Sequence, residues 1–393
     1  MNKIVFTEEF CQPENLYPFT LTRQLQDIRI GILTIREKWE QMLGLTSLDR
    51  KEDDYKDLER SVHLNDVVTE KGYVLMIHGN VLPTPGLVKE AKKLKHGEFL
   101  SVNGNVGIIF KIGKGEVQAR HKVKMKKAIT CRTEIKSIEH PWDIFQLNDW
   151  ALREDFKLLT KGRKSQSISK TNKVTKPSQF FIEKGAKVEH CIINASTGPV
   201  YIGKDAELME GSVIRGPFSI GENSVLKMGA KVYGATTIGP WCVAGGEIKN
   251  SVIFGYSNKA HDGYLGDSVI GEWCNLGAGT SNSNLKNNAS TVRIWTPKGE
   301  QKVGNKCGVL MGDYTRTAIN TSINTGTVIG VSSNVFGSGL TPKYIPSFSW
   351  GSEGIQRYEF DKAIADIEGW KKLKNQLVND NEKKIIKYIF DNF

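Results

Sequence analysis

The chain is 393 residues long, is 39% hydrophobic and carries a formal net charge of +11. This length allows two or three domains, and the absence of a long apolar run excludes a membrane-spanning helix. The basic excess comes without an aromatic and basic RNA-binding motif, so we expect anionic small molecules as partners, and neither nucleic acid nor a membrane.

The N-terminal segment and the cysteines both indicate a cytoplasmic protein. The first ten residues, MNKIVFTEEF, lack the basic start, apolar stretch and cleavage site of a signal peptide. The six cysteines are scattered without a CxxC pair. We therefore expect reduced thiols rather than disulfides or a zinc site.

Residues 1–160 alternate between strand-like and helix-like segments. Strands are predicted over Ile4–Phe6 and Tyr73–Ile77. Helices are predicted over Thr34–Leu43 and over Thr84–Leu94, where a proline occupies the first turn. This alternation predicts an α/β domain.

Residues 161–178 form a basic, polar stretch that begins KGRKSQSISKTNKVTKP. The stretch shows no apolar period, so it is expected to be a solvated linker.

The most informative pattern is a run of branched aliphatic residues spaced six apart. A six-residue period fits neither a helix nor a simple strand, but it fits a coil with three flat sides of about six residues each. Glycine follows every third of these residues, where a corner needs a residue without Cβ. The pattern predicts a left-handed parallel β-helix of hexapeptide repeats over residues 179–350. The aliphatic residues are Ile202, Leu208, Ile214, Ile220, Leu226, Val232 and Ile238, and the glycines are Gly203, Gly221 and Gly239.

Two segments depart from the rhythm. Residues 284–306 are polar with poor hexad spacing, and insertions of this kind project from one face of a solenoid, often the binding face. Residues 351–393 form the tail, which has apolar residues at three- and four-residue steps and predicts an amphipathic helix that caps the last coil or packs on another subunit. Those apolar residues are Ile364, Ile367, Trp370, Leu373 and Leu377.

His261 is the candidate catalytic residue, in the polar, glycine-rich segment from Asn258 to Asn288. It precedes a hexad corner at Leu265-Gly266, so its side chain is expected to project outward. A neutral imidazole there can accept a proton from an amine, because histidine is the side chain whose unperturbed pKa lies near working pH. Glu247 lies about one coil earlier and is a candidate to orient the imidazole.

This segment resembles the acetyltransferase half of the bifunctional GlmU family, which joins glucosamine-1-phosphate acetyltransferase and N-acetylglucosamine-1-phosphate uridylyltransferase activities. Other stretches, such as GPVYIG and KMGAKVYGATTIG, resemble a GlmU-like subgroup with an atypical N-terminal half. The residues that carry the first resemblance are Lys259, Ala260, His261, Tyr264, Leu265, Gly266, Asp267, Ile270, Gly271, Asn275, Gly277, Ala278, Gly279, Thr280 and Asn284.

The resemblance implies that His261 is the general base that deprotonates the sugar amine for attack on acetyl-CoA. It implies that Tyr264 and Asn275 contact the sugar phosphate, that Asn284 lies beside the amine and acyl group, and that the main chain at Ala278 faces the coenzyme. It also implies a homotrimer whose acyl-donor sites lie between adjacent β-helices, consistent with the flat faces of a prism.

Four further residues are candidates on neighbouring coils. The resemblance implies that Glu247 is an orienting carboxylate and that Lys249 binds phosphate, although the intervening repeat has a different length. Arg215 and Lys231 are candidates because a sugar phosphate needs charge-assisted donors. As an alternative, both are solvated charges at the edge of the prism.

The front domain matches the nucleotidyltransferase pattern only in part. Leu16–Arg23 resembles the end of the nucleotide-binding loop, but the glycine-rich part is absent. Gly79-Asn80 stands where the family has Gly-Asp, whose aspartate holds Mg²⁺, and Asn148 is a candidate second ligand. An amide oxygen brings no charge, so Mg²⁺ binding is expected to weaken.

Three functional hypotheses follow. The first is a bifunctional enzyme of UDP-N-acetylglucosamine biosynthesis, which N-acetylates glucosamine 1-phosphate with acetyl-CoA and couples the product to a nucleoside triphosphate. The second is a sugar-1-phosphate nucleotidyltransferase whose β-helix is only structural. The third is a non-catalytic regulator that binds a nucleotide sugar.

Overall fold

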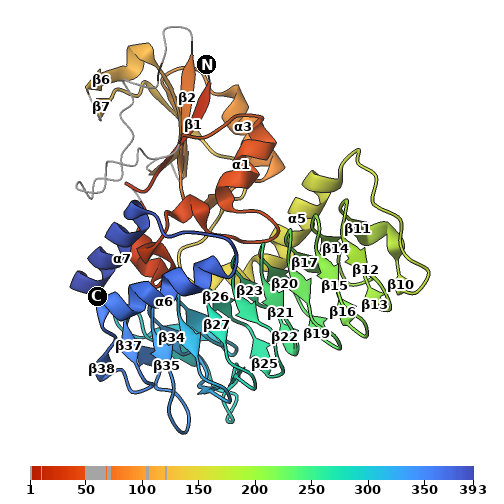
Figure 1. The fold of residues 1–393 in the computed structure, drawn as a ribbon. Helices are drawn as coiled ribbons and strands as arrows, with labels where there is room; N and C mark the ends of the chain where they lie inside the picture. The colour runs from red at the N-terminus through yellow and green to blue at the C-terminus, as the bar shows by residue number, and fades with distance from the viewer. Residues whose placement is uncertain (1, 10, 49–67, 69–71, 103–105, 120–121) are drawn as a thin grey trace. The chain divides into compact units, whose positions relative to one another are not determined.

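The computed structural model describes residues 2–9, 11–48, 68, 72–102, 106–119 and 122–393 (Figure 1). Its contacts divide the chain into two compact units that do not follow the order of the sequence. The division differs from the predicted boundary near residue 160, because residues 140–160 and two short N-terminal segments belong with the β-helix. Unit 1 comprises Met1–Pro13, Arg23–Ile28 and Leu33–Glu139, and unit 2 comprises Glu14–Thr22, Arg29–Ile32 and His140–Phe393.

Unit 1 contains a mixed sheet with the strand order β1-β2-β5-β4-β8. The outer pairs β1-β2 and β4-β8 are parallel, and the central pairs are antiparallel. The bounds in this unit are β1 (Lys3–Thr7), β2 (Tyr73–His78), β3 (Val81–Leu82), β4 (Glu98–Val102), β5 (Val106–Gly113), β6 (Val117–Ala119), β7 (Lys122–Val123), β8 (Lys127–Thr130), β9 (Lys136–Ser137), α1 (Ile35–Leu43), α3 (Pro85–Lys93) and the 3₁₀ helices η3 (Leu25–Asp27) and η5 (Lys114–Glu116).

Both predicted helices of unit 1 are confirmed, and each begins at a threonine cap. The Thr34 side chain accepts a hydrogen bond from the Glu37 amide, and the Glu37 carboxylate accepts one from the Thr34 amide. Thr84 accepts from the amide of Leu87, and Pro85 occupies the first turn of α3. These caps satisfy amides that a helix start leaves without partners.

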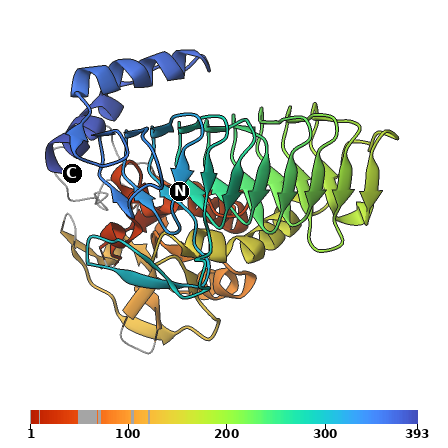
Figure 2. The same ribbon diagram turned by 90° about the horizontal axis from the view of Figure 1, so that it is seen from below.

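Unit 2 is a three-sided parallel β-helix, which confirms the fold predicted from the six-residue spacing (Figures 1 and 2). Sheet 1 consists of β10 (Lys173–Thr175), β13 (Ile192–Asn194), β16 (Val213–Arg215), β19 (Lys231–Tyr233), β22 (Glu247–Lys249) and β25 (Tyr264–Gly266), in that order. Sheet 2 consists of β11 (Phe180–Ile182), β14 (Val200–Ile202), β17 (Phe218–Ile220), β20 (Thr236–Ile238), β23 (Val252–Ile253), β26 (Val269–Ile270), β31 (Leu310–Met311), β34 (Val328–Ile329) and β36 (Tyr344–Ile345). Sheet 3 consists of β12 (Lys187–Val188), β15 (Glu207–Leu208), β18 (Val225–Leu226), β21 (Val243–Ala244), β24 (Asn258–Lys259), β27 (Asn275–Leu276), β32 (Arg316–Thr317), β35 (Asn334–Val335), β37 (Ser349–Trp350) and β38 (Gln356–Arg357).

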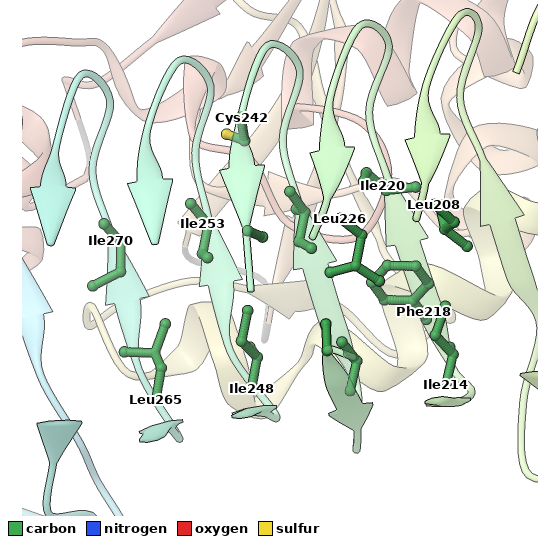
Figure 3. Close-up of a cluster of buried hydrophobic side chains, with 14 of the residues drawn as sticks. Leu208, Ile214, Phe218, Ile220, Leu226, Cys242, Ile248, Ile253, Leu265 and Ile270 are labelled. Atoms are coloured by element: carbon green, nitrogen blue, oxygen red, sulfur yellow. The ribbon is translucent and has the colours of Figure 1, made fainter. Parts of the chain in front are cut away.

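The aliphatic residues of the six-residue run fill the interior of the prism (Figure 3). Successive members of the run belong to sheets 2, 3 and 1 in turn, so residues eighteen apart stack on neighbouring coils. Ile202 pairs with Ile220, which pairs with Ile238. All seven are at most 2% exposed.

The glycines at the corner after sheet 2 are required by close approach between coils. A Cβ added to Gly203 would lie 2.7 Å from the amide nitrogen of Glu222, and one added to Gly221 would lie 2.5 Å from the nitrogen of Pro240. A main-chain atom of the next coil cannot move aside as a side chain can. The prediction of a corner that excludes Cβ is correct.

The outer surface of sheet 2 is covered by other parts of unit 2. Helix α5 (Asn148–Thr160) packs Phe156 against Phe181 and Tyr201 of this sheet. The N-terminal residue Phe19 is fully buried, with its ring centroid 5.5 Å from that of Phe254. The remaining elements here are η1 (Pro13–Leu16), η2 (Phe19–Leu21), α4 (Asp143–Gln146) and η6 (Pro177–Gln179).

The segment predicted to be a solvated linker contributes to the first coil. Strand β10 pairs with β13 of sheet 1, and Ile168 and Val174 pack against the interior. The expected linker therefore closes one end of the prism, although most of its side chains are exposed.

The predicted insertion and the predicted helical tail are both present. The insertion forms a hairpin of β29 (Val292–Ile294) and β30 (Gln301–Gly304), preceded by β28 (Ser281–Asn282), which pairs with β33 (Ser322–Ile323). The tail forms two helices, α6 (Phe360–Lys372) and α7 (Asp380–Asn392). Leu373 and Leu377, expected on the apolar stripe, are 75% and 77% exposed because α6 ends before them.

Candidate functional site

His261, Glu247 and Tyr264 lie where sheet 3 turns into sheet 1, whereas Arg215 and Lys249 end strands of sheet 1 at its other edge. On each strand of sheet 1 the middle side chain points into the prism and its neighbours point outward. Lys231, Glu247 and Tyr264 are paired in register across β19, β22 and β25, so they form one outward row. Arg215, from β16 of the same sheet, is exposed, as is Lys231.

Tyr264, Asn284 and Asp267 are joined by hydrogen bonds. The Asn284 Nδ2 donates to the Tyr264 hydroxyl at 3.0 Å and to the Asp267 carboxylate at 2.5 Å. Asn250 Nδ2 donates to the other oxygen of Asp267 at 2.7 Å. Asp267 is only 4% exposed, so two amide donors compensate for the burial of its charge. Burial and the nearby Asp267 charge raise the pKa of Tyr264 to about 12, so Tyr264 stays neutral and able to donate.

Glu247 contacts a tyrosine rather than the candidate base. The Tyr233 hydroxyl donates to Glu247 at 2.6 Å, and this bond together with burial raises the pKa of Tyr233 to about 12. The Lys249 ammonium lies 5.9 Å from the centre of the Tyr233 ring. Within the described residues no hydrogen bond or ion pair joins Glu247 to His261, so the expected orienting contact is not formed.

His261 lies in the loop of residues 260–263, here called the His261 corner, between β24 of sheet 3 and β25 of sheet 1. Its side chain is exposed, as the sequence predicted. Asn275 lies on β27 of sheet 3, and Tyr264 begins β25 of sheet 1, so the corner stands between these two candidates. An exposed imidazole at such a corner is accessible to a bound amine.

The next coil lies directly on the His261 corner. The Gly279 amide donates to the carbonyl of Asp262 at 3.0 Å, which brings the main chain at Ala278 beside the corner. The carbonyl of Ala278 accepts a hydrogen bond from the Asn320 amide at 2.7 Å. Asn275 accepts a long hydrogen bond of 3.5 Å from Asn258 Nδ2.

In unit 1, Asn80 follows strand β2 and is 6% exposed. Its Nδ2 donates to Glu139 at 2.9 Å, and its Oδ1 accepts from the Cys11 thiol at 3.3 Å. Burial, with Glu8 and Glu139 nearby, raises the pKa of Cys11 to about 11, so this thiol is not an activated nucleophile. Arg23, the candidate for nucleotide binding, is half-buried between η2 and η3.

Asn148, the candidate second metal ligand, belongs to unit 2 rather than to the unit of Asn80. It is fully buried at the start of α5, where its Nδ2 donates to the carbonyl of Ala235 at 2.8 Å. Its Oδ1 accepts from the Gly31 amide at 2.7 Å and from the Thr237 hydroxyl at 3.1 Å. These bonds occupy the amide, so Asn148 holds α5 to sheet 2 and has no oxygen available for a metal.

The described residues of unit 1 do not form a preformed magnesium site. Both polar atoms of the Asn80 amide already have partners. Among the described residues, no group of three or more histidine, cysteine, aspartate or glutamate side chains is arranged to hold a metal ion. In the same residues, no helix combines the length and the apolarity that crossing a membrane requires.

Sequence reasoning missed three residues of these sites. Tyr233 and Asp267 act through hydrogen bonds to candidate residues on other coils, and Glu139 contacts Asn80 from 59 positions away. Asp267 was visible only as one position of the GlmU-like motif. Its burial together with its own left-handed backbone (φ 48°) distinguishes it in the structure.

The fold and the clustered polar residues define the chain as a hexapeptide β-helix protein with an attached α/β unit. A family model described as sugar nucleotidyl transferase matches residues 4–164. A bifunctional sugar-1-phosphate nucleotidylyltransferase/acetyltransferase from Sulfurisphaera tokodaii is 30% identical over 59% of this chain and 55% of its own length. The bifunctional protein GlmU from Methanocaldococcus jannaschii is 36% identical over 21% of each chain.

This chain matches a larger share of the length of a third relative. The uncharacterized acetyltransferase YaiX from Escherichia coli O6:K15:H31 is 35% identical over 42% of this chain and 74% of its own length. A solved structure, the UDP-N-acetylglucosamine acyltransferase of Arabidopsis, covers 58% of this chain and 97% of its own, with 17% identity. Its TM-score of 0.28 is too low to add to the fold assignment.

The chain belongs to the same family as the acetyltransferase YaiX, and its similarity to the sugar nucleotidyl transferase model and to the bifunctional proteins confirms the resemblance predicted from the sequence. It spans about half the length of the Sulfurisphaera relative and about a fifth of the Methanocaldococcus one.

Proposed function

We propose that the β-helix transfers the acetyl group of acetyl-CoA to the amine of glucosamine 1-phosphate, and that unit 1 couples the product to a nucleoside triphosphate. These steps belong to UDP-N-acetylglucosamine biosynthesis. The observation that carries the proposal is the exposed imidazole of His261 at a corner between Asn275 on one face and Tyr264 on the next. Similarity to the bifunctional Sulfurisphaera protein and to the sugar nucleotidyl transferase model supports both halves.

In acetyl transfer, His261 acts as the general base. Its neutral imidazole takes a proton from the sugar amine as the nitrogen attacks the thioester carbonyl carbon. A carbon–nitrogen bond forms, the carbon–sulfur bond breaks, and the proton passes from the imidazolium to the departing CoA thiolate. Acetyl-CoA is therefore a substrate that is consumed.

Side chains around the corner bind the sugar phosphate. Lys249, with Arg215 and Lys231 from earlier coils of sheet 1, supplies charge-assisted donors to the phosphate oxygens. Tyr264 and Asn284 present a hydroxyl and an amide to the sugar, and their mutual hydrogen bond orients both. The main chain at Ala278, one coil further along, faces the acyl donor.

The proposal includes a homotrimer in which one copy completes the site of the next. It is supported by the apolar side chains of Ile192 and Val213 on sheet 1, which are 50% and 44% exposed. Among the described residues, no large apolar side chain of the sheet 2 strands is exposed, and α5 and Phe19 pack on that side. The six free cysteines support a cytoplasmic location, where both proposed substrates are available.

For unit 1, Arg23 and Asn80 are proposed at the nucleotide site, and no step is assigned to a metal ion because the Asn80 amide is already occupied. The same observation favours a second candidate function, in which unit 1 binds a nucleotide sugar without turnover. Pyrophosphate release from a nucleoside triphosphate and N-acetylglucosamine 1-phosphate distinguishes the two. Release supports nucleotidyl transfer, and calorimetric binding without release supports the second function.

The acetyl-transfer proposal is tested by CoA release from acetyl-CoA with glucosamine 1-phosphate. We expect His261→Asn to lower kcat by about 10²- to 10⁴-fold, because an amide cannot accept the amine proton.

The matched control is His190→Asn. His190 occupies the corresponding corner between sheets 3 and 1 in an early coil, is exposed and has a left-handed backbone (φ 55°), which asparagine tolerates. This control is expected to keep wild-type activity. CoA release that is undiminished in His261→Asn would remove this base from the mechanism.

A further inference from the structure

A lysine lies inside the prism, directly behind the candidate base. Lys259 is on β24 and is 2% exposed, although lysine is almost never fully buried without a partner. It occupies the inward column of sheet 3, where the register pairs Leu208 with Leu226, Leu226 with Ala244, and Ala244 with Lys259. The other members of this column are core residues.

The interior makes room for this side chain. Ala244, its neighbour on the preceding coil, is the smallest member of the column and leaves space for the four-carbon stem. The stem replaces the leucine that other coils carry, so its methylene groups contribute to the apolar core. The ammonium group at the end of this stem needs hydrogen-bond acceptors.

Those partners are main-chain carbonyls of the His261 corner and of the coil beneath it. Lys259 Nζ donates to the carbonyl of His261 at 2.5 Å and to that of Gly245 at 3.3 Å. One lysine thus joins the loop that carries the imidazole to the loop on which it rests. Two of its three donors are used by these bonds.

The two loops fit together closely. A Cβ added to Gly245 would lie 2.5 Å from the carbonyl oxygen of Ala260, and one added to Gly246 would lie 2.7 Å from that of His261. The corner therefore sits directly on a pair of glycines, with no side chain between them. The ammonium is the side-chain group that bonds the corner to these glycines, in addition to the main-chain bond from the Glu247 amide to the carbonyl of Gly263.

Burial makes the charged form of Lys259 less favourable than it is in water. Burial lowers its pKa to about 8, and the nearby Asp262 opposes that shift. At neutral pH the group is still mostly protonated and can donate to both carbonyls. A buried charge that aliphatic neighbours could replace indicates a role other than stability.

We propose that Lys259 is a positioning residue, which fastens the main chain of the His261 corner from inside the prism and so holds the imidazole where the amine arrives. The inference rests on the proposed acetyl transfer for its effect on rate, but the fastening itself does not. A displacement of about 1 Å at a catalytic group can lower the rate about 10²-fold.

The test compares the full-length wild type with Lys259→Met, which keeps the length of the stem and removes the ammonium. We expect kcat for CoA release to fall about 10- to 100-fold, with KM for glucosamine 1-phosphate within about threefold. We also expect the melting temperature to be unchanged or raised, because an unfavourable buried charge is removed. A residue that served only stability would lower the melting temperature and leave kcat unchanged.

Amide hydrogen exchange measures how firmly the His261 corner is held, and it does not depend on catalytic activity. The amides of Glu247 and Gly279 donate to the carbonyls of Gly263 and Asp262, so their protection reports on this loop. In Lys259→Met we expect both amides to exchange at least about tenfold faster, while the Lys227 amide, bonded to the carbonyl of Ala244, does not change. Leu226→Met, in the same interior column, is the matched control and is expected to behave as the wild type.

Unchanged exchange at Glu247 and Gly279 would overturn the proposal, whatever the effect on kcat. If Lys259→Met does not fold, kcat and hydrogen exchange are measured in Lys259→Gln instead, which keeps a hydrogen-bond donor on a shorter side chain. Unfolding of both variants would also overturn the proposal. If the wild type releases no CoA while exchange responds as expected, the proposed acetyl transfer fails and the fastening of the corner stands.

Discussion

At the scale of single residues, three buried ionisable groups differ in their hydrogen-bond partners and in how burial affects them. The buried carboxylate of Asp267 accepts hydrogen bonds from two asparagine amides. Lys259 keeps its charge near neutral pH with two carbonyls as partners, although burial lowers its pKa to about 8. His78, at the end of β2 in unit 1, is 4% exposed, and burial lowers its pKa to about 4, so it remains neutral.

His78 is therefore expected to make unit 1 sensitive to acid. Its folded pKa of about 4 lies below the ordinary value of 6.5, so the unfolded chain binds more protons between these values. The contribution to stability is complete above pH 6.5 and is lost as the pH falls toward 4, by about 2 kcal/mol at pH 5 relative to pH 7. Denaturant unfolding at both pH values measures this difference. His78→Gln should reduce it by about that amount, and an equal difference in wild type and variant would contradict the prediction.

At the scale of the elements, the repeat length changes along the β-helix. Ile202, Ile220 and Ile238 are separated by eighteen residues, whereas Ile253, the next in the stack, follows Ile238 by fifteen. The coil that carries Glu247 is thus shorter than those before it. This explains why a strict six-residue count could not place Glu247 relative to His261, and why the contact expected between them was not formed.

Glycine-to-alanine substitutions at different corners of the coils should differ in how much they destabilise unit 2. Gly221 and Gly255 both follow strands of sheet 2, but a Cβ at Gly221 would lie 2.5 Å from main chain, whereas its nearest neighbour at Gly255 would be 3.4 Å away. We expect Gly221→Ala to destabilise unit 2 by about 1–3 kcal/mol, since the next coil must move. Gly255→Ala is the control and should cost less than half as much. Equal melting temperatures for the two variants would show that the coils can separate freely.

At the scale of the whole molecule, the two units interleave in sequence. Residues 14–22 and 29–32 belong to unit 2, although most of the chain around them belongs to unit 1. Their contribution is specific: Phe19 packs on Phe254, and the Thr237 hydroxyl donates to the carbonyl of Gly31 at 2.9 Å. The β-helix is therefore incomplete without the N-terminal part of the chain.

A fragment of residues 140–393 is accordingly expected to be less stable than unit 2 in the full chain. The loss of Phe19 alone should lower the free energy of unfolding of unit 2 by about 3–5 kcal/mol. The part of sheet 2 that the fragment leaves uncovered should promote aggregation. Thermal unfolding and light scattering of the fragment and the full chain check this, with Phe19→Ala in the full chain as the smaller change. A fragment that melts at the temperature of the full chain would contradict it.

Much of the fold follows from short-range pattern. The six-residue spacing predicted the coils, and the charge pattern of residues 34–43 and the proline at position 85 predicted two helices, because these features depend on neighbours a few residues away. The family motif brought His261, Tyr264, Asn275 and Asn284 to notice on residue types and spacing. The sequence did not indicate that residues 161–178 would close the prism, because their polar composition is that of a linker.

By itself, the sequence determined the β-helix, the exposed corner that carries His261 and the resemblance to GlmU-like proteins. Only the tertiary structure decided which groups act on one another: Glu247 bonds to Tyr233, Asn148 holds α5 to sheet 2, and Lys259 reaches the His261 corner from inside. The physical reason is that a coil repeat specifies which residues point inward. Hydrogen bonds between coils depend on the length of each coil, and contacts of the covering segments depend on where distant parts of the chain pack.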